Sequence, residues 1–199
     1  MLKKKIKTGL LQQKNRLPSL IGLDMSVTST GLTIVGSGIF NVRSIRTKPS
    51  KIFDPWDDIK RMNFIVREVM DISIKTGIRT FYCEAPAFGA YDIEGKLSQL
   101  RGLFLNTLFS RGYNYPLYIA PTKLKKFITG KGNTPKTLMG EAIRRIFSKE
   151  SLNVTFTNDD EIDSFGVALF GYSVECIRAG IRKKEDYPKY QQQSMKEFI

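Results

Sequence analysis

The chain of 199 residues contains no histidine. This absence excludes Ser-His-Asp and Cys-His nucleophilic sites and metal sites with histidine ligands. The two cysteines, Cys83 and Cys176, are too far apart in the sequence for a metal-ligand motif, so we expect two reduced core thiols in a reducing compartment. No apolar run approaches the roughly 18 residues of a membrane span, and we expect no membrane association.

Positive charge is in excess and unevenly distributed along the chain. The formal net charge is +13 at pH 7. Residues 1–17 carry six basic and no acidic residues, residues 120–150 carry eight basic and two acidic residues, and residues 178–199 carry six basic and three acidic residues. Such basic segments are typical of nucleic-acid-binding proteins. A solvated basic surface is the alternative, above all for the two ends of the chain.

The domain prediction divides the chain into a basic flexible arm at 1–17, a folded domain at 18–180 and a polar tail at 181–199. One domain is typical of this length. Apolar periodicity predicts strands at 17–23, 31–35, 39–47, 79–84 and 115–120, and helices at 57–75, 93–110, 121–128, 135–147 and 160–179. Three successive strands followed by alternating helices and strands indicate an α/β fold, with a mixed sheet and helices on both faces.

Four carboxylates stand where apolar segments meet polar ones. Asp24 and Glu84 each end a strand-like apolar run, and Asp160 and Asp163 open an apolar helical segment. A spacing of three residues places the last two on one side of a helix, where they repel each other unless a cation lies between them. Converging carboxylates are typical of two divalent ions about 3.5–4 Å apart, which cleave phosphodiesters without a histidine base.

Each carboxylate also has an ordinary structural interpretation. Asp24 could cap a turn, and Glu84 could be a surface loop residue. The negative charges of residues 159–161 could stabilise the helix N-terminus through the helix dipole. Asp163 is harder to explain in this way, because the helix is already entering the core there. The joint pattern therefore favours a metal site.

The pattern resembles the RuvC-type Holliday junction resolvases of the RNase H-like superfamily, over roughly 20–172 of the chain. The resemblance is carried by Gly22-Leu23-Asp24, Glu84, Lys125, Gly130-Lys131-Gly132, Lys136 and Asp160-Glu161-Ile162-Asp163-Ser164. It implies an RNase H-like mixed five-stranded sheet with helices on both faces. It also implies a metal-dependent endodeoxyribonuclease that acts in DNA recombination and repair.

The resemblance assigns roles to individual residues. As metal-binding and catalytic carboxylates it implies Asp24, Glu84, Asp160 and Asp163. Lys125 and Lys136 would approach the scissile phosphate. We expect further DNA contacts from Lys123, Lys126, Lys131 and Phe88, although one of the three lysines at 123–126 is expected to face solvent.

The implied cofactor is Mg²⁺, two ions per active site, with Mn²⁺ as a substitute. The implied substrates are branched DNAs, four-way junctions above all. The family is homodimeric, and each subunit cuts one strand, so we expect a homodimer here.

The chain also departs from the family pattern. Met25-Ser26 stands where the family often has Pro-Gly, and Ala87 holds the position of its aromatic wedge, with Phe88 one residue later. These differences, and a basic arm and polar tail outside the family core, indicate a divergent phage, viral or organellar member. The expected location is the cytoplasm, or the host cytoplasm for a viral protein, with organellar or nuclear targeting as alternatives.

Other functions remain open alternatives. The segment 22–31 resembles the first phosphate loop of actin-like or sugar-kinase-like ATPases, but the chain is short for their two lobes and shows no second phosphate loop. A catalytically silent DNA-binding protein of the same fold is another alternative, which the intact carboxylates argue against. A guide-dependent or RNA-specific nuclease also stays open, because a fold alone does not determine the substrate.

Overall fold

A mixed sheet of five strands forms the centre of the protein, in the order β3-β2-β1-β4-β5. The computed structural model describes residues 17–86, 95–150 and 156–199. The strands are β1 (Leu20–Asp24), β2 (Ser29–Gly36), β3 (Ile39–Arg46), β4 (Phe81–Glu84) and β5 (Leu117–Ile119). β1, β2 and β3 form an antiparallel meander, whereas β4 pairs in parallel with β1 and with β5. The predicted α/β fold with a mixed five-stranded sheet is confirmed.

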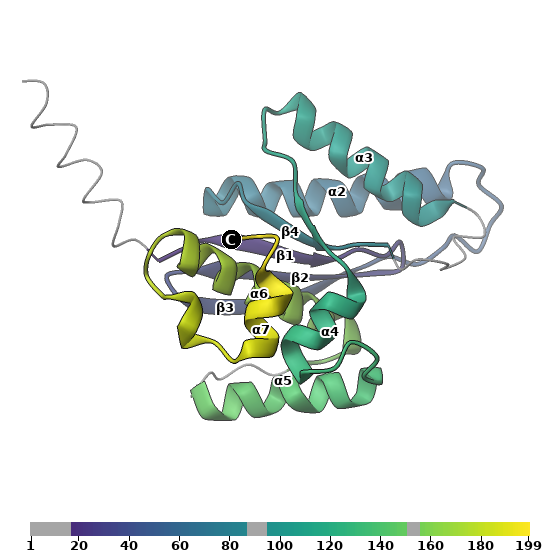
Figure 1. The fold of residues 1–199 in the computed structure, drawn as a ribbon. Helices are drawn as coiled ribbons and strands as arrows, with labels where there is room; N and C mark the ends of the chain where they lie inside the picture. Colours follow the sequence, from purple (N-terminus) through teal and green to yellow (C-terminus); the bar gives the residue numbers. More distant parts are fainter. Residues whose placement is uncertain (1–16, 87–94, 151–155) are drawn as a thin grey trace, which may run out of the picture.

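Helices cover both sides of the sheet, as predicted (Figure 1). One side carries α2 (Asp57–Thr76) and α3 (Lys96–Ser110). The other side carries α4 (Pro121–Thr129), α5 (Lys136–Glu150), α6 (Asp159–Arg178), the short helix η1 (Lys184–Asp186) and α7 (Lys189–Met195). In the described ranges, no helix is both long and apolar enough to span a membrane.

Each side of the sheet has its own hydrophobic cluster. Alternation along β1 sends Ile21 and Leu23 toward the α2 and α3 side, and Leu20 toward α6. β1 and β4 are covered on both faces, and each is buried except for its last residue, Asp24 or Glu84. This double coverage explains why both strands are continuous apolar runs in the sequence.

Helix α6 lies directly on the sheet because two glycines leave room for it. A Cβ atom at Gly22 in β1 would lie 2.6 Å from the backbone nitrogen of Ala168, and one at Gly31 in β2 would overlap the carbonyl oxygen of Asp160. Any side chain at either position would push α6 away from the strands. The two glycines therefore fix the height of α6 above β1 and β2.

Residues 181–199, expected to form a polar tail, are folded onto the domain. Tyr187 and Met195 are buried in the cluster that contains α6, and the ring centroid of Phe198 lies 5.1 Å from that of Phe170. α7 packs against α4 (Figure 1). Because single apolar residues among polar ones give no periodic signal, the sequence does not reveal this packing. The predicted basic arm lies outside the described residues, apart from the exposed Leu17.

We expect Gly31→Ala to lower the free energy of unfolding by about 1–3 kcal/mol, because the added methyl group would overlap the backbone of α6. Gly36 at the end of the same strand is the matched control, because a Cβ atom there would approach nothing closer than the Ser19 hydroxyl at 3.9 Å. Urea denaturation compares the two variants. Equal unfolding midpoints would contradict the close approach of α6 to β2.

We also expect Met195→Ala to lower the free energy of unfolding by about 2–5 kcal/mol, because it removes a buried side chain and leaves a cavity. Met195 is 0% exposed, whereas its neighbour Lys196 is exposed and provides the control Lys196→Ala. Thermal or urea denaturation measures the difference. If both variants unfolded like the unmodified protein, 181–199 would be a tail after all.

Candidate active site

Three carboxylates from separate elements line one cavity of about 340 Å³. Asp24 is the last residue of β1, and Glu84 is the last residue of β4. Because these strands are parallel neighbours, their carboxyl ends meet at the same edge of the sheet. Asp163 joins them from the second turn of α6 and is 7% exposed. Three of the four predicted carboxylates are therefore brought together.

Hydrogen bonds at the start of α6 give its acidic residues different roles. Asn158 is the N-cap, and its side-chain oxygen accepts a hydrogen bond from the backbone N–H of Glu161 at 3.0 Å. The buried Glu161 carboxylate accepts from the backbone N–H of Thr157 at 2.7 Å and from the hydroxyl of Ser44 in β3 at 3.3 Å. Glu161 thus stabilises the helix start, while Asp163 lines the cavity.

Asp160, the fourth predicted carboxylate, is not among the residues that line this cavity. It is partly exposed and lies in the first turn of α6, with its carbonyl group packed against Gly31. Two side chains that are three residues apart in an α-helix lie about 60° from each other around the helix axis. Asp160 and Asp163 therefore share one side of α6, but only Asp163 of the pair lines the cavity.

The chemistry of the cavity fits hard divalent ions, because carboxylate oxygens are the ligands that Mg²⁺ and Mn²⁺ prefer. Within the described residues, no three His, Cys, Asp or Glu side chains are gathered closely enough to hold a metal ion. Asp24, Glu84 and Asp163 would therefore have to draw closer around bound ions. Their mutual repulsion opposes such an approach unless cations are bound.

Cys83 precedes Glu84 but is not a candidate ligand. Burial raises the pKa of its thiol to about 12, so the sulfur stays protonated at neutral pH. Both Cys83 and Cys176 are buried and form no disulfide, as the sequence predicted. The cavity therefore offers oxygen ligands and no thiolate.

Two basic side chains line the same cavity, Lys125 of α4 and Arg101 of α3. Lys125 was predicted from the sequence, and Arg101 was not. The Nε atom of Arg101 is buried and has no hydrogen-bond partner among the described residues. Arg101 follows Leu97 by one helical turn, and both line the cavity. A charged residue on the apolar side of a predicted helix is the signal that could have revealed it.

The other two lysines of α4 contact the C-terminal segment. Lys123 forms an ion pair with Glu197, and this hydrogen bond lowers the pKa of the Glu197 carboxyl. The Lys126 ammonium donates to the side-chain oxygen of Gln193 at 2.9 Å. Neither lysine lines the carboxylate cavity, whereas Lys125 does. The predicted DNA contacts of Lys123 and Lys126 stay predictions.

The structure does not place three further predicted residues, Lys131, Lys136 and Phe88, in the cavity. Lys131 is exposed in the loop between α4 and α5, where the Thr129 hydroxyl donates to its carbonyl oxygen at 3.0 Å. Lys136 begins α5, but its side chain lies outside the description. Phe88 also lies outside the described residues. The roles of all three stay predictions.

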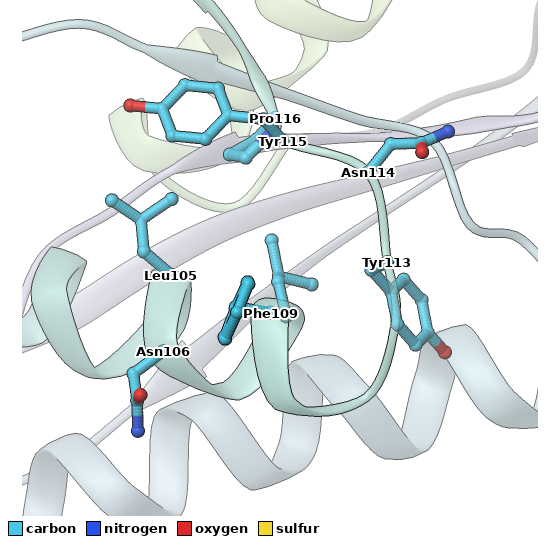
Figure 2. Close-up of a pocket in the computed structure, with 8 residues that line it drawn as sticks. Leu105, Asn106, Phe109, Tyr113, Asn114, Tyr115 and Pro116 are labelled. Atoms are coloured by element: carbon cyan, nitrogen blue, oxygen red, sulfur yellow. The ribbon is translucent and has the colours of Figure 1, made fainter.

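A second cavity, of about 370 Å³, lies at the far end of α3 (Figure 2). Its lining is apolar and aromatic and includes Leu105, Leu108, Phe109, Tyr113, Tyr115 and Pro116. Among the described residues, no carboxylate, lysine or arginine lines it. Phe109 is 84% exposed and Tyr115 is 72% exposed at its rim. Metal-dependent chemistry has no ligands here, so the carboxylate cavity is the candidate active site.

Solved structures of RuvC and of a Holliday junction resolvase share this architecture. RuvC of Thermus thermophilus is 18% identical, with a TM-score of 0.62 over 82% of this chain and 97% of that chain. The same organism's RuvC in complex with a Holliday junction substrate is 16% identical, with a TM-score of 0.61 over 79% of this chain and 94% of that chain.

The yeast mitochondrial Holliday junction resolvase is 12% identical, with a TM-score of 0.51 over 96% of this chain and 87% of that chain. No family model and no curated protein sequence matches this chain. At such low identities, the likeness is one of fold. The chain has the RNase H-like fold of the RuvC-type resolvases, as its sequence resemblance predicted.

Proposed function

We propose that this protein is a metal-dependent endonuclease that resolves branched DNA, four-way junctions above all. The observation that carries the proposal is the cavity in which Asp24, Glu84 and Asp163 meet Lys125 and Arg101. It lies at an edge of a fold that covers almost the full length of RuvC, which has been solved with a Holliday junction substrate. The net charge of +13 supports a polyanionic substrate.

Asp24, Glu84 and Asp163 would hold two Mg²⁺ ions, with Asp160 as a further ligand at the start of α6 and with Mn²⁺ as a substitute. Bound ions would supply a water of lowered pKa and would neutralise charge on the leaving oxygen. Two of the carboxylates hold defined positions in the cavity, because each ends a strand that is packed against the core on both faces. A chain without histidine has no imidazole base, which favours this type of chemistry.

Lys125 and Arg101 would hold the phosphate against the carboxylates. A guanidinium binds phosphate oxygens through a planar set of donors, and an ammonium acts as a point charge. The buried Nε of Arg101 is a donor that a phosphate oxygen would satisfy. Both groups also offset the repulsion between three carboxylates and an approaching phosphate.

The homodimer and the cytoplasmic location are part of this proposal and depend on the sequence resemblance. A resolvase must cut two strands of a junction, and one active site per subunit supplies two cuts. Sedimentation of the purified protein measures its oligomeric state. A monomer that cuts only one strand would contradict the dimer without contradicting the nuclease chemistry.

We expect the protein to nick a synthetic four-way junction in the presence of Mg²⁺ and to lose this activity in EDTA. Asp24→Asn and Asp163→Asn should each lower the cleavage rate at least about 100-fold, because each removes charge from the site at which the reaction is stabilised. Glu161→Gln is the matched control, since Glu161 contacts Thr157 and Ser44 instead of the cavity.

Gel-shift measurements in EDTA should show that the two aspartate variants still bind the junction. Full cleavage by either variant would contradict the proposed site. Hydrolysis of ATP in the absence of DNA would instead favour the actin-like ATPase alternative.

We expect Lys125→Ala and Arg101→Ala each to lower the cleavage rate by about 100-fold while the protein remains folded, because each removes a cation from the cavity. Arg101→Lys should recover part of the loss, since it restores the charge but not the planar donors. Lys75→Ala is the control, because Lys75 is an exposed lysine in the last turn of α2 and does not line the cavity. Single-turnover kinetics on the junction compare the variants, and equal losses for Lys125→Ala and Lys75→Ala would contradict the assignment of Lys125.

A further inference from the structure

The loop between β3 and α2, residues 47–56, presents three large apolar side chains to solvent. Phe53 is 91% exposed, Ile52 is 80% exposed, and Trp56 is 65% exposed. Trp56 is the only tryptophan of the chain. Scattered apolar residues on a surface are ordinary, but a group of this size within five residues usually marks an interaction site.

Hydrogen bonds hold this loop in a defined shape. The Asp57 carboxylate accepts from the backbone N–H of Ser50 at 3.2 Å, and the Ser50 hydroxyl accepts from the backbone N–H of Ile52 at 3.1 Å. The Asp54 carboxylate accepts from the backbone N–H of Trp56 at 2.9 Å. These bonds make the loop a preorganised support, so the exposed rings lose less conformational freedom when they bind a partner.

The acidic side chains of this region are paired with basic ones. Asp54 lies 2.7 Å from the Lys60 ammonium, and this hydrogen bond lowers the pKa of the Asp54 carboxyl. Asp58 contacts both Arg61 and Lys96, each at 3.0 Å.

β3 and the loop also carry four exposed basic residues, Arg43, Arg46, Lys48 and Lys51. The surface around the aromatic side chains is therefore positive. This charge is complementary to an anionic partner and unfavourable for a basic one.

The loop lies at the end of the sheet where β1 and β4 finish with Asp24 and Glu84 (Figure 1). The backbone N–H of Thr47 donates to the Thr28 carbonyl at 2.9 Å, and Arg61 donates to the Val27 carbonyl at 3.2 Å. Val27 is three residues beyond Asp24, so the turn that follows this carboxylate is attached to the start of the loop. The loop that carries the aromatic side chains is therefore anchored beside the turn that follows a cavity carboxylate.

We propose that Phe53 and Trp56 stack on unpaired or unstacked bases at the branch point of the DNA, while Lys48 and Lys51 contact the flanking phosphates. This inference rests on the proposed function. Exposed aromatic rings with nearby cations are the usual means of binding bases without sequence preference. Bases inside a continuous duplex are stacked on each other, whereas a branch point offers base faces to such rings. The loop thereby recognises the branch beside the cavity that cuts it.

The single tryptophan gives a direct measurement, because its emission comes from the proposed contact. The unmodified protein is titrated in EDTA with a four-way junction and with an unbranched duplex of the same length and sequence composition. We expect strong quenching of Trp56 emission by the junction and little by the duplex. Quenching by both DNAs to the same extent would overturn branch recognition, and no quenching by a junction that binds would overturn stacking.

Variants test the affinity that the loop contributes. Phe53→Ala combined with Trp56→Ala should weaken junction binding by about tenfold or more, measured by anisotropy of labelled DNA, and should leave duplex binding nearly unchanged. Phe109→Ala is the control, since this phenylalanine is 84% exposed at the far end of α3. Lys48→Ala with Lys51→Ala should reduce the slope of log K against log salt by about two units.

Circular dichroism and thermal melting show whether each variant is folded, and Phe53→Leu with Trp56→Leu replaces the rings by apolar groups that cannot stack. Unchanged junction affinity in folded loop variants would overturn the inference and would indicate that the apolar side chains serve a protein partner instead. An equal loss in Phe109→Ala would also overturn it. If the unmodified protein neither bound nor cut a junction, the proposed function itself would fail, which is a separate outcome.

Discussion

The contact between α6 and the sheet is the interaction on which the candidate site depends. Asp163 belongs to a helix, whereas Asp24 and Glu84 belong to strand ends, and the three line one cavity only if the helix lies at the right height. Gly22 and Gly31 set this height by letting the backbone of α6 approach closer than any side chain would permit. If the proposed function holds, core packing has a catalytic consequence, because a displacement of α6 would move one carboxylate relative to the two at the strand ends.

The cavity draws its acidic and basic groups from different layers of the fold. The acids come from β1, β4 and α6, while Arg101 comes from α3 on one side of the sheet and Lys125 comes from α4 on the other. α4 is a short helix and is covered by α7. The C-terminal segment therefore supports the helix that carries Lys125, although none of its residues lines the cavity.

The sequence predicted the parts of the site that follow from chain direction and periodicity. A carboxylate at the end of a buried strand can be recognised because apolar runs show where strands end, and parallel pairing then brings Asp24 and Glu84 to one edge. The sequence did not reveal the role of Arg101. Helical spacing predicts which side of α3 faces inward, but it does not predict which residues of that side line a cavity. The packing of 181–199 also gave no signal, since Tyr187, Met195 and Phe198 are isolated among polar residues.

The arrangement also resolves a conflict of charge. Three carboxylates repel a phosphate backbone, so a cavity of this kind cannot attract DNA by itself. Most of the excess positive charge lies in residues 1–17, 120–150 and 178–199, and exposed basic residues also lie on β3 and the 47–56 loop. In the proposed function, these basic segments would attract DNA at long range, whereas the cavity would act at short range on one phosphate. Because long-range attraction and short-range chemistry would involve different residues, a chain of net charge +13 can keep three carboxylates where its proposed substrate must come closest.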